Sequence, residues 1–521
     1  MAAIFEEQMK SDSNFGNSLF SRWTLTATAV VIGLPAIATT LRYAEDQAPG
    51  IVNPVFTTTM TEARVNELLF EGLYTDNEDL ATTPDLASGI EIADDAMSAV
   101  INLRRDVVWH DGTGFTAEDV VFTINTMQNP DTLSTEVGRV EWIEEVEALD
   151  DYSIELTFTS PQPSPQDKLN FKILPHSHFS GDAMSRGDSF RTNPIGTGPY
   201  RLVQFNDDNS VTFEVFEDYR ENVGIDELIL REVSDKSYQA RLLLYESLEA
   251  LVRVLPSDLA LLQNSRQVEL YPYQTNSWWF LGFDETEPPF DDIRVRQAVS
   301  QLVDVDNLLA PIGTGEILSG PYVKSSPFYN HEVEPWTRNE REARLLLEDA
   351  GFTQEGGSWE RDGEPLSFTI TAHQGLETAQ MVVINLQSQL RSKGIEVQTE
   401  FLDEAEWKVR VWRQRDFDSM LSQWSFDRNE DVYSQLHSDG ERNFGGYSNE
   451  RVDELLDIAR NATDPFDKRH ALRLVHELVR EDAPMLFLWT LDSYAALSRN
   501  TRNVLIHPFY FFTYVGDWRM R

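Results

Sequence analysis

Few residue groups in this chain could do covalent chemistry on a bound molecule. With 87 acidic residues, two carboxylates within reach of each other are expected by chance, so the paired acids of a glycoside hydrolase are a remote alternative. A Gly-x-Ser-x-Gly turn and a His-Glu-x-x-His helix are absent from the sequence, and with them the signal for two common hydrolase routes. We therefore expect a binding protein that is not an enzyme, with no catalytic residue and no cofactor.

Two short motifs resemble a metal site and a phosphate-binding loop, but the residues around them do not support either function. His110 and Asp111 could ligate a metal on composition alone, but Asp111-Gly112 is typical of a turn in which glycine takes positive φ. Gly196-Thr197-Gly198-Pro199 looks like a phosphate loop, yet it lacks the Lys and the hydroxyl residue that follow the glycines of a P-loop. We interpret it as a crossing of the chain between lobes, and we expect no metal site.

Composition and charge exclude a nucleic-acid binder. The chain has 43 Lys and Arg against 87 Asp and Glu, a formal net charge of −44. Affinity for nucleic acid depends on clustered basic side chains that neutralise phosphates, and a negative field also opposes an anionic membrane.

Hydrophobic residues make up 41% of the chain and aromatic residues 11%, which is ample for a folded core. At about 100–200 residues per domain, the length predicts about three folding units, which could be interleaved.

The N-terminal residues 1–40 read as a leader. Residues 23–41 follow Arg22 and contain no charge, which is typical of a signal-peptide core or a short membrane anchor. Ala36-Ile37-Ala38 has the pattern of a cleavage site, whereas the acidic stretch before Arg22, and Arg42 after the apolar run, favour retention; a buried core helix is the remaining alternative. We expect the body to lie in the periplasm or on the outer face of the cytoplasmic membrane. The chain has no cysteine, which excludes disulfides and a lipid-bearing cysteine.

Hydrophobic periodicity after residue 41 predicts an α/β protein. Apolar and polar side chains alternate in three segments, which we predict as half-buried strands at about residues 152–158, 366–370 and 395–401. Apolar side chains follow helical spacing in three others, which we predict as amphipathic helices at about residues 295–302, 379–390 and 452–459. Thr116 and Asp119 have the spacing of a capping box and open a further helix. Strands that alternate with helices indicate α/β lobes.

Several short motifs follow one another along the chain after residue 40. They are Leu41-Arg42-Tyr43-Ala44, Leu69-Phe70-Glu71-Gly72-Leu73, Pro84-Asp85-Leu86-Ala87, residues 103–112, residues 115–120, residues 196–200, residues 289–298, Phe444-Gly445-Gly446-Tyr447 with Val452-Asp453, and Asp482-Ala483-Pro484. Their order and content resemble family 5 of the bacterial extracellular solute-binding proteins, the dipeptide, oligopeptide and nickel receptors of ATP-binding-cassette importers. The run from Pro84 to residue 120 is the most specific part of this resemblance.

The resemblance implies a two-lobed, class II periplasmic-binding-protein fold with an extra inserted α/β domain. Residues 41–62, 196–282 and 491–521 would form a discontinuous first lobe, residues 63–195 the inserted domain and residues 283–490 the second lobe. Such a receptor closes on its ligand by hinge motion and delivers it to permease and ATPase subunits. By this resemblance we expect a monomer that captures peptides, oligopeptides above all, in the cleft between its lobes.

The resemblance also implies a ligand-binding carboxylate. Peptide-binding members carry a Trp-x-x-Asp whose acid holds the α-ammonium of the peptide, and Trp424-Ser425-Phe426-Asp427 matches that pattern. A partly desolvated carboxylate makes a strong charge-assisted hydrogen bond with an ammonium. The alternative is that Asp427 caps the next loop or is solvated. Dipeptide binders carry an Arg for the ligand carboxylate where this chain has Gln380, which favours longer peptides or a ligand without a carboxylate.

Aromatic side chains could form the walls of the same site. Asn276, Trp278 and Trp279 precede the strand expected to enter the second lobe and could face the cleft, while core packing of the tryptophans is the equal alternative. Trp407, Trp412 and Trp424 would also suit sugar stacking, so an oligosaccharide ligand stays open, as does a metal chelate held by some of the nine His. A membrane-anchored sensory or folding-assisting protein with the same lobes is a further alternative.

The acid-rich, lysine-poor composition predicts a stability that depends on salt. Repulsion among like charges is strong in dilute buffer and screened in concentrated salt. We expect the melting temperature, followed by circular dichroism, to rise steeply from low to molar KCl. A melting temperature that stays flat over that range would contradict a salt-adapted surface.

Overall fold

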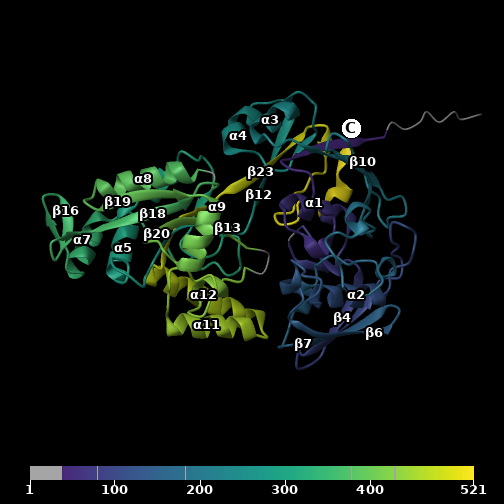
Figure 1. Cartoon of the computed structure of the whole chain (residues 1–521), viewed down its shortest axis with the longest axis horizontal. Helices are drawn as coiled ribbons and strands as arrows, with labels where there is room; N and C mark the ends of the chain where they lie inside the picture. Colours follow the sequence, from purple (N-terminus) through teal and green to yellow (C-terminus); the bar gives the residue numbers. More distant parts are fainter. Residues whose placement is uncertain (1–37, 79, 182, 377, 427–429) are drawn as a thin grey trace, which may run out of the picture. The chain divides into compact units, whose positions relative to one another are not determined.

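The computed structural model describes residues 38–521 apart from residues 79, 182, 377 and 427–429. The predicted leader therefore lies almost entirely outside the described residues. In the part of the chain that is described, no helix is both long enough and apolar enough to cross a membrane. The described chain builds three larger sheets, each from strands that lie far apart in the sequence (Figure 1).

The largest sheet has seven strands, and its middle strand comes from the start of the described chain. In spatial order the strands are β12 (Val268–Gln274), β23 (Asp492–Ser498), β11 (Ala250–Leu251), β1 (Thr40–Glu45), β10 (Glu227–Glu232), β9 (Val211–Val215) and β8 (Tyr200–Phe205). Strand β1 pairs in parallel with β10 and β11, and the other neighbours are antiparallel. Leu41 and Tyr43 pack into one core and Ala44 into another, so β1 is covered on both faces.

A four-stranded antiparallel sheet is formed by residues between 87 and 158. Its strands are β4 (Ala87–Ile92), β5 (Ser98–Leu103), β7 (Ser153–Phe158) and β6 (Ile143–Asp150), in that spatial order. Helix α2 (Ala117–Gln128) packs against β6 and β7 in the same core. The predicted strand near residues 152–158 is confirmed, and so is the capping box, because the backbone N–H of Thr116 donates to Asp119 Oδ2 at 2.9 Å.

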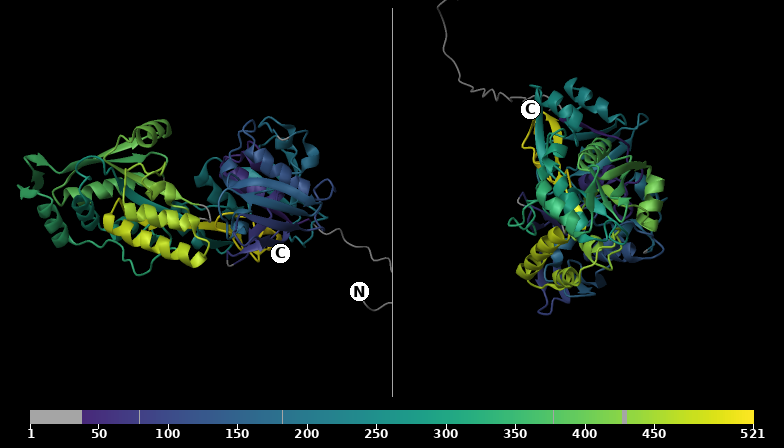
Figure 2. Two further views of the ribbon diagram at one scale, coloured as in Figure 1. Left: turned by 90° about the horizontal axis from the view of Figure 1, so that it is seen from below. Right: turned by 90° about the vertical axis from the view of Figure 1, so that its left-hand side faces the viewer.

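The five-stranded sheet has helices on both faces. Its spatial order is β19 (Glu396–Leu402), β18 (Ser367–His373), β20 (Ser419–Ser425), β13 (Ser277–Phe283) and β21 (Met485–Phe487). One face carries α5 (Ile293–Leu302), α7 (Glu340–Asp349) and α8 (Ala379–Arg391). The other carries α11 (Glu450–Asn461) and α12 (Pro465–Asp482), which lie side by side (Figures 1 and 2). The two strands and three helices predicted for this region are confirmed.

Shorter elements connect the three sheets. The helices are α1 (Met60–Leu69), α3 (Lys236–Leu244), α4 (Pro256–Gln263), α6 (Val305–Leu309), α9 (Glu404–Trp407) and α10 (Tyr433–Leu436). The strands are β2 (Tyr74–Asp76), β3 (Thr82–Pro84), β14 (Glu316–Ile317), β15 (Thr353–Glu355), β16 (Ser358–Arg361), β17 (Glu364–Pro365), β22 (Trp489–Thr490), β24 (Thr501–Arg502) and β25 (Arg519–Met520).

Two short links carry the chain between the seven-stranded and five-stranded sheets. Residues 275–276 separate β12 from β13, and residues 488–491, which include the short strand β22, separate β21 from β23. Because β13 belongs to the five-stranded sheet, the first link lies before the predicted boundary at residue 282. The apolar run at residues 278–283 would suit a buried strand of either sheet, which is why periodicity alone does not place this boundary.

His110 joins two of the motifs by hydrogen bonds. Its Nδ1 accepts from the backbone N–H of Gly196 at 3.1 Å, so its Nε2 is the donor to the carbonyl oxygen of Gly198 at 3.0 Å. Both ring nitrogens are thereby occupied, which argues against the metal alternative. A Cβ at Gly196 or Gly198 would overlap backbone carbonyls at the end of α1. The glycines are needed for this close approach, and the motif packs against a helix end instead of holding a phosphate.

A buried ionic cluster connects residues of two other motifs with the segment between β9 and β10. Arg220 donates to Glu71 Oε2 at 2.8 Å and to Asp85, while the hydroxyl of Tyr219 donates to Glu71 Oε1 at 2.9 Å. All four side chains are largely buried. Charges in such a place are tolerated only when they are paired and hydrogen-bonded, so these acids serve the fold.

Buried histidines predict a loss of stability in mild acid. Burial lowers the pKa of His110 to about 4 and that of His476, which is hydrogen-bonded to Ser319, also to about 4. Between about pH 6.5 and pH 4 the unfolded chain binds protons that the folded chain does not. The free energy of unfolding should therefore fall as pH drops through this window, by up to about 3 kcal/mol per histidine.

Urea unfolding over that pH range tests this expectation. His476→Gln should unfold with a shallower pH dependence than the wild type, because glutamine does not titrate. Carboxylates titrate alike in both proteins, so the difference between the two curves isolates the histidine. Identical slopes would contradict the assignment.

Candidate functional site

The Trp-x-x-Asp segment lies at the end of β20, beside the start of β13. Trp424 is directly opposite Trp278 in the antiparallel ladder. The backbone N–H of Phe426 donates to the carbonyl oxygen of Asn276 at 2.8 Å, which holds this segment against the link between the sheets. Asp427, the predicted ammonium ligand, lies outside the described residues. The structure thus brings together four of the predicted site residues.

Six aromatic rings form a continuous series from the core to the surface near this segment. Phe426 packs on Trp278, Trp278 on Phe280, Phe280 on Trp424, Trp424 on Phe444 and Phe444 on Trp412, with centroid distances of 5.7, 5.3, 6.0, 5.9 and 6.4 Å. These distances are within the range of favourable ring pairs. We call these six residues the aromatic series. Trp278 is fully buried, whereas Trp412 is 45% exposed.

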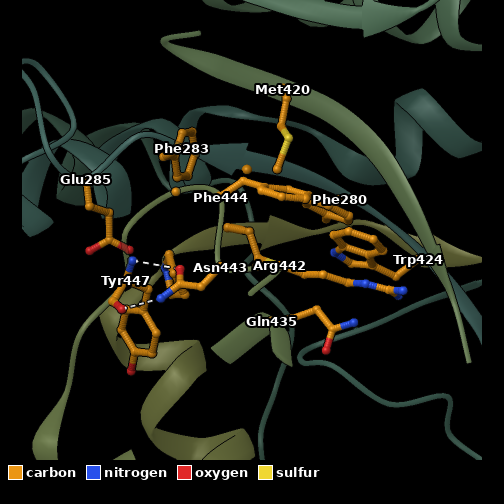
Figure 3. Close-up of a pocket in the computed structure, with 14 residues that line it drawn as sticks. Phe280, Phe283, Glu285, Met420, Trp424, Gln435, Arg442, Asn443, Phe444 and Tyr447 are labelled. Carbon is orange, nitrogen blue, oxygen red and sulfur yellow. Dashed lines mark hydrogen bonds between the residues drawn. The ribbon is translucent and has the colours of Figure 1, made fainter. Parts of the chain in front are cut away.

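A small cavity lies beside the middle of the aromatic series (Figure 3). Rings of Phe280, Trp424 and Phe444 form one side, while Glu285 and Tyr447 lie at the other end. Its free volume of about 20 Å³ is enough for about one water molecule and far too small for a peptide. The cavity therefore belongs to the interior that supports the site, not to the ligand-binding surface itself.

The loop after α10 closes this cavity through the Phe-Gly-Gly-Tyr motif. Asn443 Oδ1 accepts from the backbone N–H of Tyr447 at 3.0 Å, and its Nδ2 donates to the carbonyl oxygen of the same residue at 2.7 Å (Figure 3). A Cβ at Gly445 would overlap the carbonyl oxygen of Phe283, and Gly446 has φ +70°. The two glycines thus allow the tight loop that places Phe444 against Trp424.

Glu285 is the most perturbed acid at the cavity. One carboxylate oxygen pairs with the guanidinium of Arg296 at 2.9 Å, and among the described residues the other, Oε1, is buried without a hydrogen-bond partner. Burial raises the pKa of Glu285 to about 7, against the opposing effect of Arg296. At this half-buried position just after β13, burial therefore favours the protonated form of the carboxyl group.

Of the remaining predicted site residues, Trp407 is buried in the same core as Trp278, whereas Trp279 and Gln380 lie elsewhere. Trp279 points to the opposite face of β13 and packs on Trp489 at 6.1 Å. Trp407 is buried at the end of α9, edge-on to His373 at 5.9 Å. Gln380 is exposed in the first turn of α8. Core packing, the alternative left open for Trp278 and Trp279, describes both side chains, and Trp407 is buried in the same manner.

Sequence reasoning missed the residues around Phe444. The Phe-Gly-Gly-Tyr motif is visible in the sequence, but it indicates a loop without saying what the loop contacts. Phe444, Gln435 and Arg442 line the cavity with Trp424 only because the loop folds back onto β20. The paired glycines were the available signal, since they often mark close backbone approach.

Replacing Glu285 by glutamine should change how stability depends on pH. For the wild type, the free energy of unfolding should fall as pH rises from about 4.5 to about 7, because the folded state holds the proton more tightly, by up to about 3 kcal/mol. Glu285→Gln removes this contribution, so the variant should gain stability relative to the wild type as pH rises.

Chemical unfolding monitored by tryptophan fluorescence provides the measurement. Glu287→Gln, at an exposed position two residues on, is the matched control and should unfold with the wild-type pH dependence. If Glu285→Gln and the control behaved alike, the raised pKa would be wrong.

Comparison with known proteins agrees with this architecture. The family model described as bacterial extracellular solute-binding proteins, family 5 Middle, matches residues 81–445. The oligopeptide-binding protein AppA of Bacillus subtilis is 25% identical over 482 residues, which cover 88% of each chain. The glutathione-binding protein GsiB of Pectobacterium atrosepticum is 26% identical over 462 residues, which cover 85% of this chain and 87% of the relative.

The fold is also similar to solved structures. NikZ from Campylobacter jejuni, in complex with Ni(L-His), aligns with a TM-score of 0.76 and 26% identity over 92% of this chain and 99% of that protein. The two-lobed periplasmic-binding fold that the sequence motifs imply is therefore the fold of this chain. The chain belongs to family 5 of the bacterial extracellular solute-binding proteins.

Proposed function

We propose that this protein captures oligopeptides outside the cytoplasm and delivers them to the membrane subunits of an ATP-binding-cassette importer. The observation that carries the proposal is the position of Trp424 and Phe426, the residues before Asp427 in the sequence, beside the link between the sheets, where the hydrogen bond from Phe426 to Asn276 holds them. A relative that aligns over most of its length is an oligopeptide-binding protein. In this proposal the protein is a monomeric receptor that works with permease and ATPase subunits and catalyses no reaction.

The chemistry of the segment suits the N-terminus of a peptide. Phe426 precedes Asp427 in the sequence, and its half-buried ring, stacked on Trp278, offers an apolar surface to a ligand. A carboxylate that a bound ligand partly desolvates binds a cation more strongly than one in water. The formal charge of −44 adds a long-range attraction for cationic groups that weakens with salt.

The rest of the peptide would be held without a dedicated carboxylate clamp. Gln380 is neutral and exposed, so we propose that the C-terminus of the ligand is left unfixed and that longer peptides are accepted. Main-chain hydrogen bonds then carry most of the affinity, and side chains lie in loose pockets. We assign the lobes to the residue ranges predicted from the sequence, except that the boundary predicted at residue 282 is placed at residues 275–276. Hinge motion at residues 275–276 and at Leu491 would close the lobes on the ligand.

Ligand identity can be read from native mass spectrometry of residues 41–521 purified in high salt. Adducts whose masses fit peptides would support the proposal and give the peptide length. Adducts spaced by hexose units, or a mass that fits a metal chelate, would replace the peptide by one of the alternative ligands within the same family.

Asp427→Asn should selectively weaken the binding of peptides with a free N-terminus. Losing a charge-assisted hydrogen bond in a desolvated site is expected to reduce affinity by about 1.5–3 kcal/mol, roughly tenfold to a hundredfold or more. The N-acetylated form of the same peptide has no ammonium and should bind both proteins almost equally.

Isothermal titration with a peptide found by mass spectrometry and with its N-acetylated form measures both affinities. Asp431→Asn removes a nearby exposed acid and controls for the change in net charge. An equal loss for both forms of the peptide in Asp427→Asn would rule out the ammonium role.

A further inference from the structure

In one short segment the basic residues outnumber the acidic ones, unlike in the chain as a whole. Residues 408–415 hold four basic side chains and no acid, in a protein whose acids outnumber its bases by 87 to 43. The segment directly follows α9 and forms a π-helix, Lys408–Gln414. This is a rare conformation that occurs often at functional sites.

Two of the four cations are neutralised and two are not. Lys408 pairs with Glu404 at 2.6 Å, and Arg410 pairs with Glu400 at 2.7 Å and with Asp416 at 3.1 Å. Arg413 and Arg415 are exposed, and within the described residues neither has an ion-pair partner. In so acidic a chain, two neighbouring guanidinium groups without carboxylates are available to an external anion.

Exposed apolar side chains accompany these arginines. Trp412 is 45% exposed and Val409 42% exposed. The ring of Trp412 is held nearly parallel to that of Phe444, at an interplanar angle of 12°, and the ammonium of Lys408 lies 5.9 Å from its centroid. We call Val409, Trp412, Arg413 and Arg415 the basic-aromatic patch. An exposed indole and two arginines without ion-pair partners, within four residues of the described sequence, have the composition of an interface hot spot.

We propose that the basic-aromatic patch is the docking surface for an acidic loop of the importer's permease subunit. This inference rests on the proposed function and extends it to the partner. Carboxylates of the loop would pair with Arg413 and Arg415 in two-pronged hydrogen bonds, and an apolar side chain would cover Trp412 and Val409. The apolar contact persists in concentrated salt, where the ion pairs weaken.

An anionic lipid surface fits the patch less well than a protein loop. A membrane is an extended plane of negative charge, so it would meet the field of the whole protein, with its formal charge of −44, and not the patch alone. A loop that reaches only residues 409–415 avoids most of that repulsion. The ring of Trp412, stacked on Phe444, also offers an apolar surface for a single side chain, which a fluid headgroup layer does not need.

Site-specific photocrosslinking in native membranes tests the proposal. A benzophenone amino acid at Val409 of the full chain is expected to form an adduct with an integral-membrane permease subunit, at a peptide that contains Asp or Glu. The same probe at Ile458 on α11, which is 47% exposed, is the matched control and should form little of that adduct. Adducts with lipid or with a second copy of this chain, equal yields at both positions, or no adduct at Val409 would each overturn the proposal.

Charge reversal separates the docking surface from the ligand site. With the probe at Val409, Arg413→Glu together with Arg415→Glu should lower the permease adduct about tenfold, while peptide affinity stays within about twofold of the wild type. The milder Arg413→Gln and Arg415→Gln pair gives a second readout if the reversed variant has a lower melting temperature. An adduct yield unchanged in both variants would show that the arginines do not bind the partner.

The two proposals can fail separately. If the protein carries peptides but only a probe placed elsewhere reaches the permease, the patch is not the docking surface and the proposed function stands. If no position reaches a permease and no peptide is carried, the proposed function itself is wrong.

Discussion

Strand β13 is the element on which the five-stranded sheet and the candidate site depend, because it is buried on both faces. All seven of its residues are buried. Successive side chains point to opposite sides of a strand, so Trp278 and Phe280 enter one core while Trp279, Leu281 and Phe283 enter the other. A shift of one residue would exchange these two sets of side chains, and the surrounding helices would no longer fit. The same strand fixes Trp424 through the ladder to β20 and begins directly after the two-residue link from the seven-stranded sheet.

The family motifs serve mainly to let distant segments approach closely. Gly196 and Gly198 lie against the end of α1, Gly445 lies against Phe283, and His110 bonds to the backbone of the first two. Glu71 and Asp85, which belong to two of these motifs, are paired with Arg220 in the interior. Motif residues of this kind maintain the scaffold, and ligand recognition is left to loop and strand ends that the scaffold positions.

Charge organises the surface on two scales. Across the whole chain, acids outnumber bases by 87 to 43, which gives a formal net charge of −44. Locally, the π-helix after α9 carries uncompensated arginines next to an exposed tryptophan. The aromatic series joins this surface to Trp424 and Phe426 through ring contacts with centroid distances of 5.3–6.4 Å. Partner docking and ligand binding would therefore involve neighbouring parts of one packed structure.

The sequence by itself determined the family, the α/β class and several elements, because periodicity, capping residues and motif order are local properties of the chain. It identified the strands at residues 366–370 and 395–401 and the helix that begins after Thr116. Only the tertiary structure decided that Trp278 and Trp279 enter different cores, that Phe444 stacks on Trp424, and that the first link lies at residues 275–276. A hydrophobic run shows that residues will be buried, but which sheet and which face bury them depends on strand pairing between segments more than a hundred residues apart, such as β13 with β20.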